Sequence, residues 1–490
     1  MKIILSTDDK SVVENYIQSL VLLYKPLEKF GAGEHDSTLT FVIKDCDDSF
    51  SGFARLEQSD HAFEKHMTES KKIYALSKNA AKCFSGKLFL SLFTEVFGYK
   101  PPWGILTGVR PARYALDFLL NGVSPEKTKE ILVNMYHADV DKAQLAVSVA
   151  LCDFNVLKDA GDREYSLYIG IPFCPSRCRY CSFVSYATPN LFKLLPSYLE
   201  LLTEETKMLV DTANELGLSL KSVYVGGGTP SVLAEEQMQD FLPRIRKILG
   251  DNLPEFTYEA GRPDTVTQRK LDILKQNGVT RLSVNTQTTN DRILESVGRC
   301  HTFDDYKKAF FMAKEKGFLI NTDLIAGLPG ESFESFCQSI DDVSALCPDN
   351  ITVHSFTLKK SSDFTVTGAT LDRKNSHIEK MISYSSKRMG ECGYFPYYMY
   401  RQKNTDGNCE NVGYSKDEKS MALYNIYMME GFHTVLAAGA GASTKLVSKN
   451  LLGQAKIYNP KYPYEYLRQK DDILKNREQI LLFYKEKYNQ

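Results

Sequence analysis

From residue 166 onward, short apolar runs alternate with longer segments in which apolar residues recur at the spacing of a helix. The short runs suit buried strands, and each longer segment has one apolar face that can pack on a sheet. The expected strands are residues 166–171, 223–226, 256–259, 281–284, 320–325 and 351–356. The expected helices are residues 195–215, 235–249, 266–276, 303–316 and 332–345.

Repeated strand and helix units of this kind predict parallel strands that are joined by right-handed crossovers. Six such units make a partial (β/α)6 barrel, whereas a complete barrel has eight. The expected fold class is therefore α/β. In such folds the active site lies at the carboxyl ends of the strands.

The pattern differs at both ends of the chain. Residues 1–6 and 38–43 read as strands around a helix at 11–24, and residues 87–157 are mostly helical. We expect three regions: an amino-terminal α+β domain at 1–160, the partial barrel at 161–360, and a mostly helical carboxyl-terminal region at 361–490 that covers the active site. Residues 101–113 contain the only tryptophan and favour a structural loop closed by prolines and glycines, although a basic, aromatic element that touches substrate also fits.

Composition narrows the class of protein. A chain of 490 residues with 43% hydrophobic and 25% charged residues is typical of a globular protein with two or three domains. The net charge of −1 and the absence of a long basic run argue against nucleic acid as a partner. The amino terminus turns polar too early for a secretory signal, and no apolar run reaches membrane-spanning length. Together with eleven cysteines that fit reduced thiols, this predicts a cytoplasmic protein.

Three cysteines follow the first barrel strand at a C-x3-C-x2-C spacing: Cys174, Cys178 and Cys181. Three thiolates can hold three irons of a [4Fe–4S] cluster and leave the fourth iron open to another ligand. The two prolines in this segment argue against a buried helix face. No second cysteine pair or nearby histidine completes a structural zinc site. The spacing therefore favours a cluster-binding loop.

The cysteine loop and the strand–helix pattern resemble the radical S-adenosylmethionine (SAM) enzymes. Residues 224–230, Tyr-Val-Gly-Gly-Gly-Thr-Pro, end the second strand as the glycine-rich SAM-binding segment of that family does. Glycines at this place let the backbone approach the methionine amine of SAM, because no side chain intervenes. The resemblance implies a [4Fe–4S] cluster on the three cysteines, with SAM at the open iron.

Further matches resemble the oxygen-independent coproporphyrinogen III oxidases, in which polar and charged residues at successive strand ends hold SAM. The residues that this resemblance implies as SAM contacts are Tyr168, Tyr180, Gly227, Gly228, Thr229, Glu259, Gln287, Arg299 and Asp323. Among them, the implied catalytic residues are Tyr168, Glu259, Gln287 and Asp323. Residues 108–113, 259–265, 400–404 and 439–442 extend the similarity to the long Gram-positive type, which has an extra amino-terminal domain.

The resemblance implies that the enzyme converts coproporphyrinogen III to protoporphyrinogen IX. A 5′-deoxyadenosyl radical would start each oxidative decarboxylation, two SAM molecules would be consumed per turnover, and a donor such as flavodoxin or ferredoxin would supply electrons. Basic side chains should bind the four substrate carboxylates. The candidates are Arg110, Arg113, Arg262, Lys359, Lys360 and Arg401.

One position departs from the oxidase pattern. Phe183 stands where the oxidase has a fourth cysteine, as in relatives that traffic or degrade heme. The three cluster cysteines are unaffected, but two alternatives to the oxidase stay open. One is a radical SAM methyltransferase that degrades heme. The other is a heme-trafficking protein, with an axial ligand such as His301 or His354 near the barrel mouth.

Overall fold

The computed structural model describes the chain except for a set of short segments and one longer one. The residues outside the description are 27, 32, 34, 60, 159, 162, 182–185, 251, 252, 254, 358–376, 403, 404, 450–452, 489 and 490. The chain forms two compact units. Unit 1 comprises Met1–Phe154, Thr370–Glu379 and Met399–Glu410, and unit 2 comprises Asn155–Ala369, Lys380–Tyr398 and Asn411–Gln490.

Unit 1 is built on a four-stranded sheet of order β1-β2-β3-β4, with β1 parallel to β2 and the other pairs antiparallel. The strands are β1 Lys2–Thr7, β2 Ser37–Asp45, β3 Ser49–Gln58 and β4 His61–Ser70. The helices are α1 Glu14–Val21, η1 Lys71–Tyr74, α2 Ala80–Phe97, α3 Ala112–Leu120, α4 Pro125–Asn134 and α5 Val140–Lys158, the last of which runs into unit 2.

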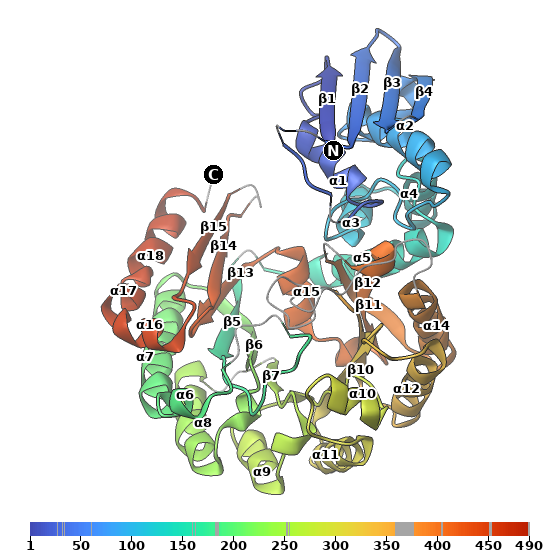
Figure 1. Ribbon diagram of the computed structural model, residues 1–490. Coiled ribbons are helices and arrows are strands. Elements are labelled where there is room, and N and C mark those ends of the chain that lie inside the picture. The colour runs from blue at the N-terminus through green and yellow to red at the C-terminus, as the bar shows by residue number, and fades with distance from the viewer. Residues whose placement is uncertain are drawn as a thin grey trace. The chain divides into compact units, whose positions relative to one another are not determined.

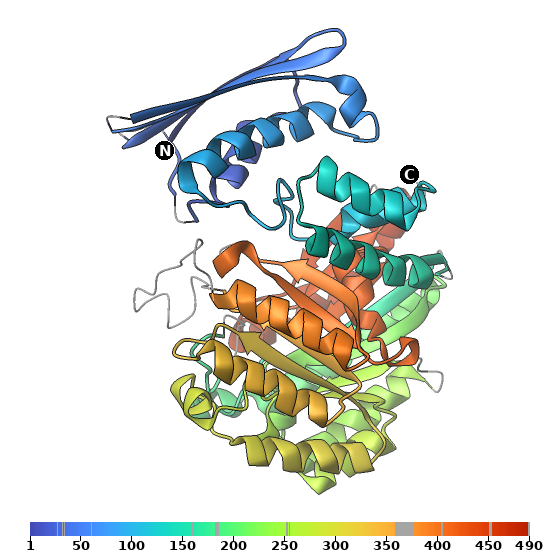
Figure 2. The same cartoon turned by 90° about the vertical axis from the view of Figure 1, so that its right-hand side faces the viewer.

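Helix α2 lies along one face of this sheet (Figure 2) and contributes buried phenylalanines to the core. A close approach between helix and sheet explains Gly52 on β3. A Cβ atom there would lie 2.7 Å from a methyl group of Leu88 and 2.9 Å from the ring of Phe84. The glycine therefore lets α2 pack against the strand without displacing its large side chains.

Unit 2 contains the partial barrel that the hydrophobic pattern predicted. Its strands are β5 Glu164–Ile171, β6 Ser219–Gly227, β7 Phe256–Glu259, β8 Arg281–Ser283, β9 Leu319–Ala326 and β10 Asn350–Ser355. All neighbouring pairs among them are parallel and follow chain order. Helices between them form an arc along the outside of the sheet (Figure 1). These helices are α6 Pro189–Phe192, α7 Leu195–Glu215, α8 Glu235–Leu249, α9 Gln268–Gln276, α10 Asp291–Ser296, α11 Phe303–Glu315 and α12 Phe333–Ala345.

The carboxyl-terminal part of the chain adds helices and also five strands, which extend the sheet to the order β11-β12-β10-β9-β8-β7-β6-β5-β13-β14-β15. Strand β13 is parallel to β5, and β12 is antiparallel to β10. These elements are α14 His377–Glu391, β11 Phe395–Arg401, β12 Glu410–Ser415, α15 Leu423–Glu430, β13 Thr434–Ala438, β14 Ser443–Val447, β15 Gln454–Tyr458, α16 Pro463–Arg468, α17 Lys470–Leu474 and α18 Asn476–Glu486. Short 3-10 turns are η2 Pro230–Val232, η3 Pro263–Thr265, η4 Asp406–Asn408 and η5 Glu418–Ser420.

A buried carboxylate ties this carboxyl-terminal part to α7. Glu205 on α7 accepts hydrogen bonds from the Gly439 N–H at 2.8 Å, from Asn459 at 2.7 Å and from the Tyr466 hydroxyl at 2.6 Å. Burial raises the pKa of Glu205 to about 7, although the three donors oppose that shift. In the part of the chain that the structure describes, no helix is long and apolar enough to cross a membrane.

Candidate active site

The three predicted cluster cysteines lie in one loop, residues 172–181, directly after β5; we call it the cysteine loop. Cys174 is buried, while Cys178 and Cys181 are half-buried. The loop is fastened at its start by a hydrogen bond of 3.1 Å from the Cys174 N–H to the Tyr186 carbonyl. Near its end, the Arg179 N–H donates to the Val297 carbonyl at 3.0 Å. The thiols therefore sit on a backbone that protein contacts hold at both ends.

The glycine-rich end of β6 packs directly on the cysteine loop. The Gly228 N–H donates to the Ile171 carbonyl at 3.0 Å, and the Thr229 N–H donates to the Phe173 carbonyl at 2.7 Å. A Cβ atom on Gly228 would lie 2.5 Å from the Phe173 oxygen, so no other residue fits there without displacing backbone. The Thr229 hydroxyl lies 3.4 Å from the Cys174 sulfur. This packing gives Gly228 a structural role in addition to the SAM approach that the sequence suggested.

Glu259, at the end of β7, faces the same segment. Its carboxylate accepts a hydrogen bond from the Tyr224 hydroxyl, and a Cβ atom on Gly226 would lie 2.8 Å from its Oε2 atom. Burial raises the pKa of Glu259 to about 7, and the negative charge of Asp323 adds to that rise. The donors, Tyr224 and the Gly227 N–H, oppose the shift. Glu259 can thus hold or release a proton near neutral pH.

Asp323, on β9, is kept ionised by its neighbours. Asn285 donates to Oδ2 at 2.9 Å, Asn321 donates to Oδ1 at 2.8 Å, and His354 Nε2 lies 3.7 Å from Oδ2. Burial by itself would raise the pKa of Asp323, but His354 and the amide of Asn321 bring it below its ordinary value. Two carboxyl groups at one edge of the sheet therefore differ in protonation, Glu259 near 7 and Asp323 low.

Gln287 follows β8 in an unusual backbone conformation. Its φ of 76° lies in the left-handed region, which is costly for a residue other than glycine. The conformation is held by two hydrogen bonds of 2.9 Å to β9, from the Gln287 N–H to the Asp323 carbonyl and from the Ile325 N–H to the Gln287 carbonyl. The bonds fix Gln287 beside Asp323.

Arg299 joins the strand ends to the cysteine loop. Its Nη1 atom donates to the Tyr180 hydroxyl at 2.8 Å, and Nη2 donates to the Gly261 and Asn285 carbonyls at 2.8 and 2.9 Å. The side chain is 5% exposed, and its Nε atom has no hydrogen-bond partner among the described residues. A buried guanidinium with one open donor is suited to an anionic group of a bound molecule.

Comparison with known proteins identifies the family. The radical SAM superfamily matches residues 168–343, a range that includes the cysteine loop, Glu259, Gln287, Arg299 and Asp323. The oxygen-independent coproporphyrinogen-III oxidase-like protein HemZ of Bacillus subtilis is 32% identical over 489 residues, covering 94% of each chain. The chain belongs to this radical SAM family. The heme chaperone HemW of the same organism is 37% identical over 203 residues, 41% of this chain and 52% of that protein.

The fold of this family member agrees with a solved structure. Coproporphyrinogen III oxidase (HemN) from Escherichia coli, a radical SAM enzyme, superposes with a TM-score of 0.50 at 23% identity. The superposition covers 65% of this chain and 72% of the solved one. It confirms the radical SAM fold that the sequence predicted.

The cofactors of a radical SAM protein are a [4Fe–4S] cluster and SAM, and the residues present fit both. Among the described residues no three His, Cys, Asp or Glu side chains converge on a single ion. A cubane requires no such convergence, because each thiolate binds a different iron. For SAM, the open Nε donor of Arg299 suits a carboxylate, and the ionised Asp323 suits hydroxyl or ammonium donors.

Three stacked tyrosines border the strand ends, and the sequence did not reveal them as a group. The rings of Tyr224 and Tyr424 stack at 4.5 Å between centroids, and Tyr168 lies 6.3 Å from Tyr224 and 6.4 Å from Tyr424. Burial raises the pKa of all three hydroxyls, so they stay neutral. Tyr424 comes from α15, far along the chain, and only its aromatic character was visible in the sequence. Asn285 and His354 likewise gain their role beside Asp323 only through strand pairing.

Among the basic residues expected to bind substrate carboxylates, Arg262 is the one that the structure describes in unit 2. Arg262 is 3% exposed, forms a two-pronged ion pair with Asp264 at 2.9 and 3.0 Å, and donates to Ser176 in the cysteine loop. It supports the loop. Lys359, Lys360 and Phe183 lie outside the described residues, and Arg110, Arg113 and Arg401 belong to unit 1.

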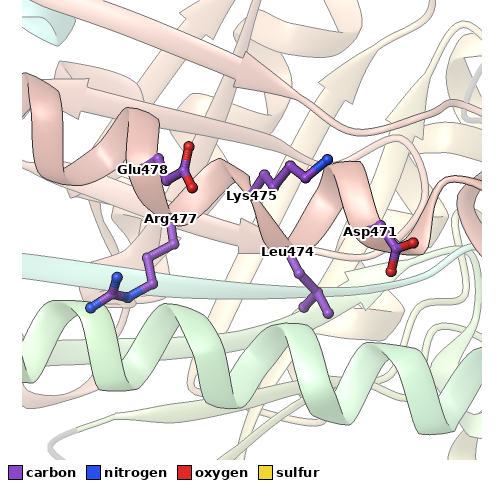
Figure 3. A pocket seen from close by; sticks show the side chains of 5 residues that line it. All are labelled: Asp471, Leu474, Lys475, Arg477 and Glu478. Carbon is purple, nitrogen blue, oxygen red and sulfur yellow. The ribbon is translucent and has the colours of Figure 1, made fainter.

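A pocket at the junction of α17 and α18 is shown in Figure 3. It is lined by Asp471, Leu474, Lys475, Arg477 and Glu478. Its cations already have partners, since Lys475 pairs with Asp472 at 3.5 Å and Arg477 pairs with Glu215 on α7. The chemistry of this surface is that of solvated ion pairs.

Proposed function

We propose that the protein catalyses the oxygen-independent oxidative decarboxylation of coproporphyrinogen III to protoporphyrinogen IX. The observation that carries this proposal is the meeting of the cysteine loop with the strand ends of β6 to β9, in a chain that matches an oxidase-like relative along 94% of its length. The cluster and SAM would bind where the cysteine loop contacts these strand ends. The length of the match favours a tetrapyrrole over the other substrates of the superfamily.

Cluster and SAM together supply a one-electron route to a carbon radical that can abstract a hydrogen atom from an unactivated position. The protein contributes binding and position. The thiolates of the cysteine loop would hold iron. The ionised Asp323 would accept hydrogen bonds from SAM, and Arg299 Nε would donate one, while Gln287 is aligned beside Asp323 by its bonds to β9. Glu259 can adjust its protonation to the bound charge, because its pKa lies near 7.

The tyrosine stack would protect the reactive region. Tyr168, Tyr224 and Tyr424 present neutral rings beside Glu259, so water is replaced there by aromatic surface. Exclusion of water limits side reactions of a reactive intermediate. We also propose that an external donor such as flavodoxin or ferredoxin supplies electrons, and that the protein works in the cytoplasm, where thiols remain reduced.

A second candidate function is heme binding for transfer to other proteins. The observation that favours it is the higher local identity, 37%, to a heme chaperone. Histidine is also available in unit 2, since both ring nitrogens of the buried His301 lack partners among the described residues. This function predicts a stable heme complex without turnover.

The test is an anaerobic reaction of the reconstituted, reduced protein with SAM and coproporphyrinogen III. We expect 5′-deoxyadenosine together with a tetrapyrrole product that has lost two carbon dioxide molecules and four hydrogens. Asp323→Asn, which keeps the size of the side chain, should lower both products in parallel. Deoxyadenosine without decarboxylation would remove the substrate assignment. A stable heme complex with neither product would favour the second candidate.

A further inference from the structure

Unit 1 contains a cavity of about 760 Å³ that the radical chemistry does not use; we call it the amino-terminal cavity. Its walls come from α1, the start of α2, α3 and the segment 105–110. The aromatic part of the wall consists of Tyr16, Tyr114, Phe118 and Tyr136. A volume of this size lies within the range of small-molecule and cofactor sites, which is about 300–1,000 Å³.

The charge of the amino-terminal cavity is one-sided. Four cations line it, Lys78, Lys82, Arg110 and Arg113, and one carboxylate, Asp117. Asp117 pairs with Arg113 at 3.1 Å and with Lys78 at 3.7 Å. Among the described lining residues, basic side chains therefore outnumber acidic ones. An anionic ligand is therefore favoured. Two or more carboxylates would match this excess better than one.

Apolar side chains at the cavity remain accessible to solvent. Leu76 is 50% exposed, Val109 47% and Tyr114 38%, and all three line the cavity. Tyr114 and Tyr136 meet edge to face at 5.3 Å, and Lys82 lies 4.5 Å above the ring of Tyr16. A flat, largely apolar ligand would cover these surfaces and gain hydrophobic free energy.

The wall segment 105–110 is held in place by the protein itself. The Arg401 N–H donates to the Val109 carbonyl at 2.7 Å, and its guanidinium donates to the Leu106 carbonyl. At the start of the segment, the Ile105 N–H donates to the Tyr136 carbonyl at 3.0 Å, and Trp103 donates to the buried Glu410 at 2.8 Å. A preformed wall lowers the entropic cost of binding. Arg401 thus supports the wall.

We propose that the amino-terminal cavity is a tetrapyrrole-binding site, built from residues other than those that would hold the cluster and SAM. The macrocycle would lie against the tyrosines, and its carboxylates would meet Lys82, Arg110 and Arg113. The choice of a tetrapyrrole rests on the proposed function. The requirement for a flat, apolar molecule with several carboxylates rests on the cavity alone.

The experiment uses the full-length protein without cluster or SAM and coproporphyrin III, a stable oxidised tetrapyrrole, as the probe. Trp103 is the only tryptophan of the chain and stands two residues before the wall segment, so its emission reports on the cavity. We expect saturable quenching of this emission. Gly108→Phe should weaken binding at least about tenfold, a change of about 1.4 kcal/mol. Nothing lies within 4 Å of a Cβ atom at Gly108, so a side chain can begin there without displacing its neighbours.

Control variants distinguish a loss of probe binding from a loss of the folded structure. Gly108→Ala adds one methyl group at the same position and should bind as the wild type does. Arg110→Glu should weaken binding without filling the cavity, whereas Lys10→Glu, an exposed lysine of unit 1 outside the cavity, should not. Thermal unfolding of each variant checks the fold.

The proposal and the proposed function can fail separately. Unchanged quenching in both Gly108→Phe and Arg110→Glu would overturn the cavity site, even if the protein decarboxylates coproporphyrinogen III. Absence of probe binding in the wild type would do the same. Quenching that depends on both positions in a protein without turnover would retain the cavity site and remove the proposed reaction.

Discussion

The strand-end site of unit 2 and the amino-terminal cavity of unit 1 place their polar groups in opposite ways. At the strand ends, Glu259, Arg299 and Asp323 are held by hydrogen bonds to neighbouring strands and loops. The lining of the amino-terminal cavity includes aromatic and apolar side chains, and its cations range from half-buried, as Lys82 is, to exposed, as Lys78 is. The first arrangement fixes geometry, while the second provides surface and net charge.

The two regions therefore suit different ligands. Buried groups with fixed partners have perturbed pKa values and suit a charged cofactor that must be positioned to within a fraction of an ångström. Accessible apolar walls with cations suit a large ligand whose binding comes from buried area and paired carboxylates. Substitutions that affect one region and spare the other therefore test the comparison.

The largest effect is expected for Cys174→Ser. Loss of this thiolate removes one iron ligand, so iron content should fall and SAM cleavage should drop to background. Quenching of Trp103 by coproporphyrin III should persist, because the amino-terminal cavity is in unit 1. The control is Cys392→Ser. Cys392 directly follows α14 and is not in the cysteine loop. Equal loss of iron in both variants would contradict the assignment.

The next largest effect is expected for Gly228→Ala. The added methyl group meets the Phe173 carbonyl at 2.5 Å, and overpacking of this kind costs about 1–3 kcal/mol. SAM affinity should fall about tenfold to a hundredfold, since 1.4 kcal/mol corresponds to a factor of ten. Equilibrium dialysis with labelled SAM measures it. In Gly390→Ala, on α14, nothing lies within 4 Å, so that variant should keep its affinity and gain helix stability.

A smaller effect is expected for Asn285→Ala, because Asn285 positions Asp323 without being proposed to touch SAM. The variant removes a donor at 2.9 Å and leaves the carboxylate less stabilised, which raises its pKa. SAM affinity should fall about tenfold, for a loss near 1.4 kcal/mol, and the acid limit of SAM binding should move to higher pH. Asn277→Ala removes an equally buried amide, 8% exposed in both cases, and should leave the pH profile unchanged. A lower affinity with an unshifted profile would argue against the positioning role.

The last effect is on the stability of the protein without cofactors, not on SAM binding, and concerns its dependence on pH. The folded pKa of Glu259 is about 7, above its ordinary value of 4.5, so the folded state retains a proton that the unfolded state releases. Stability must then fall as pH rises between these values. Glu259→Gln should remove about 2 kcal/mol of this fall between pH 5 and 8, measured by urea unfolding. Parallel curves for variant and wild type would show that Glu259 ionises normally.

Local patterns were enough to predict the centre of unit 2. Helices α7 and α8 have the bounds that apolar periodicity predicted. The strand predicted directly before the cysteines is present as β5. The spacing of three cysteines is itself local information, so the cysteine loop could be placed from sequence. Strands buried on both faces read as continuous apolar runs, which is why β5 to β10 stood out.

Other features depend on contacts between distant segments and could not be predicted. Strand β4 has no buried residue, so no apolar run marks it in the sequence, and it pairs along its length with β3. Asn285 reaches Asp323 only because β8 and β9 are neighbours. The amino-terminal cavity joins Tyr16 to residues about ninety positions later in the chain. No local motif encodes such a meeting.

The most direct test of the account is electron paramagnetic resonance of the reduced protein with and without SAM. If the cysteine loop and the strand-end residues form one site, SAM should shift the signal of the cluster in the wild type. In Asp323→Asn the shift should require higher SAM concentrations, while the signal without SAM stays the same. A cluster signal that SAM leaves unchanged at saturating concentration would contradict the account.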